Sequence, residues 1–472
     1  MLLALAFAAA EGLAAGSPSQ DWTRYGSDNQ QTNYRPAAAF AGLTPSTAKR
    51  LRAAWRVSVD GGVVASPLYA ASFQIGARKR NVLYVATESG SVYALDAATG
   101  RTLWQRKLGA VKTPCGITYG ISSTGVLDRS RHRLFVIGAT GLLHALDMRT
   151  GKELAGWPLR LSTHPDAEYV WGGLTINPKV GLLYVPFATY CDLAGADGFR
   201  GDGRLVAVDV AHPQVVATLD VVPGVQNMGG IWGYGGTSID PIDGVLWTAT
   251  GNAANNGKDA TPEGERVLEL DPRTLAVIAG NHPSAIDKYD DGDFGSTPTL
   301  FEPPGCAPLA AAYAKNGVMY VWRRSALAAD PVWSVKIGAA GAGTSPFVGE
   351  PSYSPAEHTL YVSDALWTAP DGPKIQGVAA FRIRAGCAFP SAPTWATKLG
   401  TGVKAPGLVV GDVLFVTGGD TKRFYALDVR SGKVLWGAPL NGPGYSSPIL
   451  AGSEVVVGTY QGQVSAFGLA RR

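Results

Sequence analysis

The sequence predicts an all-β protein, an eight-bladed β-propeller of four-stranded antiparallel blades, and three observations point to this class. A motif of one alternating strand, an Asp slot, a Gly-containing turn and a returning strand recurs eight times within 472 residues. Glycine and proline are abundant, at 60 and 31 residues, which favours many short strands joined by turns. The apolar fraction of 46% is large enough to fill an extensive core.

The repeat is clearest in three copies, YALDAATGRTLW from Tyr93, HALDMRTGKEL from His144 and YALDVRSGKVLW from Tyr425. Weaker copies follow the same order. Aligning all copies on the Asp slot gives positions 96, 147, 209, 271, 323, 382, 428 and 468, which lie 40 to 62 residues apart by subtraction. A period of this size is expected of propellers and solenoids.

Each copy has the pattern of a four-stranded antiparallel sheet. The turn after Asp contains glycine, which adopts positive φ without a steric cost, and a further strand pair stands upstream, as in SPLYA and NVLYVATESG. One such sheet cannot bury both faces, whereas eight stacked radially can. The last copy stops after its third strand, so we expect a segment within residues 51–59 to supply the outer strand and close the ring. Residues 17–472 are therefore predicted to form one propeller domain.

Residues 1–16 are similar to a secretory signal. The apolar run from Leu2 to Ala10 is too short to cross a bilayer as a helix, and small residues such as Ala14 and Ala15 suit a cleavage point. A buried N-terminal helix is the alternative interpretation. We expect a periplasmic or secreted protein without a transmembrane segment.

Composition and spacing exclude several other classes. A net charge of +4, with 17% charged residues and no basic block, argues against a nucleic-acid partner. The four cysteines form neither CxxC nor CxxCH, which excludes a zinc ribbon and a covalently attached c-type haem. The six histidines show no pair at ligand spacing, and neither a GxSxG elbow nor a phosphate loop is present.

An even number of cysteines in an exported chain allows two disulfides, in three possible pairings. In the predicted topology, Cys115 and Cys191 lie in loops on one face of the ring, whereas Cys306 and Cys387 lie in turns on the opposite face. A disulfide is too short to cross the thickness of the ring. We therefore expect the pairs Cys115–Cys191 and Cys306–Cys387.

The unit ALDxxTGxxLW resembles the tryptophan-docking repeat of the pyrroloquinoline quinone (PQQ) family, which includes quinoprotein alcohol dehydrogenases and non-enzymatic propellers of outer-membrane assembly lipoproteins. Four further stretches resemble the dehydrogenase branch: DWTRYGSDNQQTNYRP, GGIWGYGGTSIDPIDGVLWTATGN, DGDFGSTPTLF and YAKNGVMYVWRR. The resemblance implies an exported oxidoreductase that oxidises an alcohol or sugar hydroxyl with PQQ and calcium. Electrons would then pass to a separate acceptor, because no haem motif is present.

The same resemblance assigns roles to four polar residues. Asp293 is implied as the base that takes the proton of the substrate hydroxyl, and Lys315 as the cation beside the quinone oxygens. Asn252 and Asp192 are implied as oxygen ligands of calcium. The topology supports this grouping, because loops joining strands 2 and 3 and loops leading into strand 1 share one face of the ring.

Alternatives stay open for several of these residues. The resemblance implies an aromatic floor for the quinone at Tyr234, with Trp232 as the second choice, and both also suit core packing of the inner strands. The loop of Asp192 offers two other carboxylates, Asp197 and Asp202. The remaining aspartates of DKYDDGDFG fit solvent-facing turn positions.

Four departures weaken the enzymatic interpretation. Cys115 stands alone where the dehydrogenases carry two adjacent cysteines, and no arginine lies within residues 109–125. Val64 stands where a glutamate is expected, and the Asn-Trp pair expected before PSYSP is replaced. Each missing buried polar contact weakens quinone binding by about 1–3 kcal/mol. A non-catalytic propeller that binds a protein or a cell-envelope polymer is therefore the second hypothesis.

Overall fold

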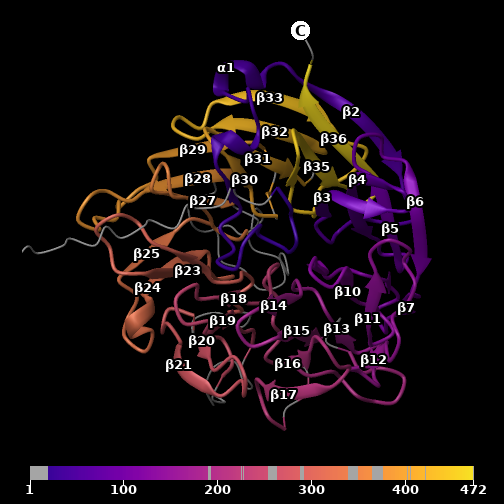
Figure 1. Ribbon diagram of the computed structural model, residues 1–472. Coiled ribbons are helices and arrows are strands. Elements are labelled where there is room, and N and C mark those ends of the chain that lie inside the picture. Colours follow the sequence, from indigo (N-terminus) through magenta and orange to yellow (C-terminus); the bar gives the residue numbers. More distant parts are fainter. Residues whose placement is uncertain are drawn as a thin grey trace, which may run out of the picture.

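The structure confirms an eight-bladed β-propeller (Figure 1). This computed structural model describes residues 20–189, 193–224, 226, 228–252, 263–286, 292–338, 349–363, 376–400, 402–403, 405–419 and 421–470. The colours of Figure 1 run around the ring in sequence order. Helix within these ranges is limited to η1 (Ala37–Ala39), α1 (Pro45–Ala48) and η2 (Arg324–Ala326). No helix in this part of the chain is long and apolar enough to cross a membrane.

Each blade is a sheet whose first strand is buried near the axis and whose fourth strand is partly exposed at the periphery. Blades 1 and 2 are β3 (Leu68–Ile75), β4 (Arg78–Ala86), β5 (Ser91–Asp96), β6 (Thr102–Lys107), and β9 (Val126–Asp128), β10 (Arg133–Ile137), β11 (Leu142–Asp147), β12 (Leu159–Arg160). Blades 3 and 4 are β14 (Thr175–Asn177), β15 (Leu182–Thr189), β16 (Arg204–Asp209), β17 (Val215–Asp220), and β18 (Ser238–Ile239), β19 (Leu246–Ala249), β20 (Val267–Leu270), β21 (Val277–Asn281).

The second half of the ring follows the same order. Blades 5 and 6 are β22 (Thr299–Phe301), β23 (Leu309–Tyr313), β24 (Val318–Arg323), β25 (Trp333–Lys336), and β26 (Ser352–Ser354), β27 (Thr359–Ser363), β28 (Gly377–Arg382), β29 (Trp395–Lys398). Blades 7 and 8 are β30 (Leu408–Val410), β31 (Val413–Gly418), β32 (Arg423–Asp428), β33 (Val434–Pro439), and β34 (Ile449–Ala451), β35 (Glu454–Gly458), β36 (Gln463–Leu469), β2 (Leu51–Ser58). Shorter strands join the sheets or form a hairpin: β1 (Tyr34–Arg35), β13 (Glu168–Tyr169), and β7 (Val111–Lys112) with β8 (Thr118–Tyr119).

The recurring tryptophan and glycine of the repeat have a packing cause at the periphery. Trp104 of β6 donates from Nε1 to the carbonyl of Met148, in the turn after β11 of the next blade, at 3.1 Å. Its ring also covers Gly151, where an added Cβ would lie 2.6 Å from a ring carbon, and Gly151 has a φ of +68°. Glycine therefore serves both the backbone conformation and the tryptophan contact. Trp55 on Gly100 and Trp395 on Gly432 repeat the arrangement.

The ring closes through β2, which pairs antiparallel with β36 from Leu51↔Leu469 to Ser58↔Gln463. The last repeat thus gains its outer strand from the N-terminal part of the chain, and the edge of β36 is covered. With this strand, blade 8 is a four-stranded sheet.

A stretch that sequence reasoning left without a structural role, Trp22–Arg35, crosses the centre of the ring. We call it the axial segment. It joins the first strand of successive blades by backbone hydrogen bonds of 2.7–2.9 Å, because the inner edges of those strands present N–H groups that need partners. Its carbonyls accept from Tyr69, Leu127, Ile239, Leu300, Tyr353 and Val409.

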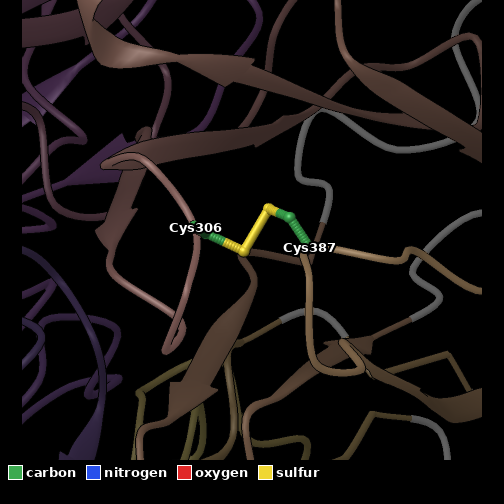
Figure 2. The surroundings of a disulfide bond; sticks show 2 residues. All are labelled: Cys306 and Cys387. Atoms are coloured by element: carbon green, nitrogen blue, oxygen red, sulfur yellow. A yellow bond between two sulfur atoms is a disulfide. The ribbon is translucent and has the colours of Figure 1, made fainter.

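The structure confirms one of the two predicted disulfides. Cys306, between β22 and β23, is bonded to Cys387, between β28 and β29, with a Cα–Cα distance of 5.1 Å (Figure 2). The bond links blade 5 to blade 6. Cys115 lies at the exposed tip of the β7–β8 hairpin, and its predicted partner Cys191 lies outside the described residues. The pair Cys115–Cys191 therefore stays a prediction.

Candidate active site

The structure brings three of the predicted site residues together at blades 4 and 5. Asp293 precedes β22, Lys315 lies in the turn between β23 and β24, and Asn252 follows β19. The Nζ atom of Lys315 lies 2.5 Å from Oδ2 of Asp293, and the backbone N–H of Asn252 donates to Oδ1 of Asp293 at 2.6 Å. With its amide turned so that the nitrogen faces the carboxylate, the side chain of Asn252 also donates to Asp293.

The local backbone explains why these side chains meet. Phe294 forms an antiparallel bridge with Ala314, and the N–H of Lys315 donates to the carbonyl of Asp293 at 2.9 Å. On the other side, a Cβ at Gly251 would lie 2.5 Å from Oδ1 of Asp293 and 3.0 Å from the carbonyl oxygen of Gly230. Glycine is therefore required at 251 for the carboxylate to approach the backbone of blade 4.

The site is an ion pair held away from water. Asp293 is 2% exposed and Lys315 is 6% exposed. Removing one partner of such a pair leaves a buried charge, which costs about 3–5 kcal/mol. The carboxylate also accepts a hydrogen bond from the backbone N–H of Asn252. Chemically, the arrangement offers a proton acceptor beside a fixed positive charge.

The two candidate floor residues have different surroundings. Tyr234 is 4% exposed and belongs to a buried aromatic cluster, where it stacks on Tyr25 at 5.9 Å and meets Trp171 edge-on at 5.4 Å between ring centroids. Trp232 is only partly buried, and its Nε1 edge would lie 3.1 Å from a Cβ at Gly251. Trp232 is thus the ring beside Asp293, whereas Tyr234 lies deeper.

A buried carboxyl group that sequence reasoning missed lies near this cluster. Glu350 is fully buried, and neither of its oxygens accepts a well-formed hydrogen bond within the described part of the chain. Burial raises its pKa well above the ordinary value, and the nearby N–H groups of Thr297 and Gly235 offset this only in part. The replaced Asn-Trp pair before PSYSP was the one sequence signal at this position.

The other predicted carboxylates are dispersed or undescribed. Asp192 and the aspartates 287, 290 and 291 lie outside the described residues. Asp197 pairs with His164, at 2.5 Å between Oδ2 and Nδ1. Asp202 lines a surface cleft with Asp220. Among the residues that the structure describes, no group of three His, Cys, Asp or Glu side chains is placed to hold a metal ion.

One wall of the site carries the kinds of group that would hold a quinone and a hard cation, with both oxygens of Asp293 engaged here by Lys315 and Asn252. Asn252 and Asp293 offer amide and carboxylate oxygens, the donors that calcium prefers, and Lys315 offers a cation for developing negative charge. Trp232 offers a flat apolar face. The expected glutamate position, Val64, is instead 4% exposed within the same aromatic cluster.

Two segments of the chain match known protein families. Residues 22–160 match the family described as "Glucose/ethanol/alcohol dehydrogenase, beta-propeller domain". Residues 366–470 match the family described as "Outer membrane protein assembly factor BamB". The two matches correspond to the two branches that the repeat left open.

Relatives found by sequence are named as dehydrogenases of alcohols. A polyvinylalcohol dehydrogenase of a Pseudomonas species is 24% identical, over 89% of this chain and 67% of that protein. A 1-butanol dehydrogenase (cytochrome c) of Thauera butanivorans is 28% identical, over 43% of this chain and 26% of that protein.

Solved structures share the fold at low identity. The quinohemoprotein alcohol dehydrogenase of Comamonas testosteroni is 16% identical, with a TM-score of 0.72 over 97% of this chain and 82% of that one. BamB of Moraxella catarrhalis is 14% identical, with a TM-score of 0.56 over 89% of this chain and 99% of that one.

Proposed function

From the premise that the chain is an eight-bladed β-propeller of the PQQ type, we propose that it is a quinoprotein-type oxidoreductase that oxidises an alcohol. The observation that carries the proposal is the buried cluster of Asp293, Lys315 and Asn252, which unites a proton acceptor, a cation and an amide. The relatives named for alcohol oxidation support the substrate class, and the relative named for polyvinylalcohol extends it to hydroxylated polymers.

The chain's own residues divide the work as follows. Asp293 accepts the hydroxyl proton of the alcohol. Lys315 balances the charge of Asp293 in the resting site and stabilises negative charge as the proton moves. Trp232 supplies a flat surface that excludes water, and Asn252 orients the carboxylate through its N–H. A bound PQQ would supply the two-electron oxidant, which these residues do not contain.

Several finer assignments belong to the same proposal. Calcium would be held by Asn252 with Asp192, and its role would be to polarise the oxidant. The signal-like residues 1–16 would direct the protein to the periplasm or the exterior. The electrons would leave to a separate acceptor, since the sequence carries no motif for covalently bound haem.

Replacing Asp293 by Asn tests the proposal. The amide keeps the shape of the side chain and removes the base, so we expect kcat to fall by about 10²–10⁴-fold with PQQ, calcium and an artificial acceptor. The single variant leaves the Lys315 ammonium without its carboxylate. The double variant Asp293→Asn/Lys315→Met removes both charges and therefore controls for folding. An Asp293→Asn enzyme with the wild-type rate would remove Asp293 from the chemistry.

A binding scaffold is the second candidate function, and the match of residues 366–470 to BamB favours it. Titrating the purified protein with PQQ and calcium separates the two. A bound-quinone absorption spectrum that depends on calcium supports the oxidoreductase. If millimolar PQQ causes no spectral change, the binding scaffold is the function that remains.

A further inference from the structure

A series of hydrogen bonds runs from Tyr169, a member of the aromatic cluster, to Glu88. The hydroxyl of Tyr169 donates to Oγ of Ser122 at 2.8 Å. Ser122 in turn donates to Oε1 of Glu88 at 2.6 Å, and the N–H of Gly120 donates to Oε2 of Glu88 at 3.2 Å. Each hydrogen bond in this series is donated in the direction of Glu88. Glu88 lies in the turn between β4 and β5, which the repeat does not mark as special.

The chain begins within the candidate active site. The ring of Tyr169 lies 6.3 Å from that of Trp232 and 6.1 Å from that of Trp171, between centroids. Trp232 borders Gly251, which touches the carboxylate of Asp293. These ring contacts connect the surroundings of Asp293 to the series of hydrogen bonds that ends at Glu88.

Their electrostatic surroundings differ. Asp293 contacts the ammonium of Lys315, whereas Glu88 contacts only neutral donors in the described residues. Burial raises the pKa of Glu88, and the hydrogen bonds from Ser122 and Gly120 offset part of that rise.

The charged groups nearest to Glu88 are themselves paired. In the same turn region, Thr87 donates to Asp60, which also pairs with Lys107 at 3.2 Å. Across the interior toward blade 3, Glu168 pairs with Arg204 at 2.8 Å. Neither pair presents an unbalanced charge to Glu88, so its surroundings and its two donors govern its protonation.

A route from this chain to solvent lies between blades 2 and 3. A small cavity of about 10 Å³, room for one water, is lined by Tyr119, Ser122, Ser162 and Glu168 among others. Ser162 and Glu168 also line an open cleft of about 310 Å³ that holds His164 and Asp202. Hydrogen-bonding groups therefore continue from Ser122 to the surface.

We propose that Tyr169, Ser122 and Glu88 form a proton relay that carries a proton from the candidate active site to Glu88, and that the small cavity at Ser122 connects the relay to the cleft between blades 2 and 3. The relay rests on the proposed oxidation. Removal of two electrons from an alcohol releases two protons, one from oxygen and one from the hydrogen that leaves carbon with the electron pair. Asp293 accepts the first. The second becomes free when the electrons reach a one-electron acceptor, and it passes through Tyr169 and Ser122 to the Glu88 carboxylate.

Infrared difference spectroscopy of the whole protein during a pH titration tests the relay without relying on activity. We expect a carboxylic-acid band, absent in Glu88→Gln, whose midpoint lies above that of an ordinary glutamate. Ser122→Ala removes the donor to the ionised form, so the midpoint should rise by about one pH unit. Tyr169→Phe removes one hydroxyl and keeps the ring, and we expect a smaller rise in the same direction. Glu350→Gln, the matched control, should remove a different band.

Turnover supplies the second readout. Ser122→Ala and Tyr169→Phe should each lower kcat about tenfold and enlarge the solvent deuterium isotope effect, with KM unchanged. A purely structural role would not alter the isotope effect. Midpoints of Glu88 that are unmoved in both variants would overturn the relay. If the midpoints move but the wild type oxidises no alcohol with PQQ, the proposed function fails, and with it the relay's part in oxidation.

Discussion

The buried carboxyl group of Glu350 makes folding of this protein sensitive to pH. Its pKa in the folded state lies above the ordinary value of 4.5, because burial disfavours the charged form. The folded state therefore holds its proton at pH values where the unfolded chain has released it. Ionisation then costs folding free energy, and stability falls as pH rises from about 4.5 toward the folded pKa.

Replacing Glu350 by Gln should remove this pH dependence. The amide is neutral at every pH, so we expect the variant to have a higher urea midpoint than the wild type above neutrality and a similar one below pH 4.5. Chemical denaturation at several pH values measures the difference. A variant that is equally destabilised at all pH values would show that shape, and not charge, governs this position.

Asp60 provides a control with the opposite sign. Its burial is outweighed by hydrogen bonds from Ser91, Thr87 and Lys107, which together lower its pKa below 3.8. Its contribution to stability is therefore present above that pH and is lost as the pH falls further. Asp60→Asn should weaken the protein at neutral pH and match the wild type in acid, the reverse of the trend for Glu350→Gln.

The close approach of Gly251 to Asp293 also gives a testable prediction. Because a Cβ there would lie 2.5 Å from Oδ1 of Asp293, Gly251→Ala must displace the carboxylate from Lys315. We expect a loss of about 1–3 kcal/mol in unfolding free energy, together with most of the alcohol oxidation. Gly437→Ala is the matched control, since its nearest neighbour would lie 3.4 Å away. Equal melting temperatures and rates for the two variants would contradict this account.

At the residue scale, the sequence predicted the grouping of Asp293, Lys315 and Asn252, because each stands in a loop whose place in the blade follows from the repeat. It did not predict Glu88 or Glu350. Neither occupies a repeat position, and the direction of a loop side chain depends on neighbouring blades that are distant in sequence. The burial of Tyr234 likewise depends on its stacking with Tyr25, a residue of the axial segment that is distant in sequence.

At the element scale, the third strand of each blade was the most predictable. The repeat fixes its end through the Asp slot and the turn that follows. Outer strands were less predictable, as blade 2 shows. After Glu153 the pairing with β11 is interrupted, and β12 is only Leu159–Arg160. Gly156 has a positive φ, and Pro158 has no N–H for the ladder, so the sequence around them cannot continue the strand.

The disulfide between blades 5 and 6 stabilises the ring at this scale. Cys306 and Cys387 are 81 residues apart, and in the chain-entropy model closing a loop of that length removes entropy from the unfolded chain worth about 4–5 kcal/mol. We expect the double variant Cys306→Ala/Cys387→Ala to melt several degrees below the wild type. Reductant should lower the melting temperature of this variant less than that of the wild type. Identical melting curves would show that packing of the two turns alone holds the blades together.

At the scale of the whole molecule, two N-terminal segments hold the ring in different ways. The outer one, β2, completes blade 8 by pairing with β36. The inner one, the axial segment, bonds to the first strands of blades 1, 2 and 4 to 7. The role of β2 was predictable, because the last copy of the repeat lacks its outer strand. The second left no periodic signal, because its residues satisfy N–H groups of six separate sheets in turn.

Removing residues 1–35 while keeping β2 separates these roles. The amides of Leu127, Ile239, Leu300, Tyr353 and Val409 lose their acceptors, so we expect their hydrogen exchange to accelerate markedly. The amide of Val59 donates to Gly462 at the ring closure, and its protection should persist. Hydrogen-exchange mass spectrometry of the two proteins measures both. Unchanged protection of these five amides would mean that the inner edges of the blades find other hydrogen-bond acceptors. Loss of protection at Val59 as well would show that the ring cannot stay closed without its axial segment, because the inner edges of the blades then lack the hydrogen bonds that fix their spacing around the axis.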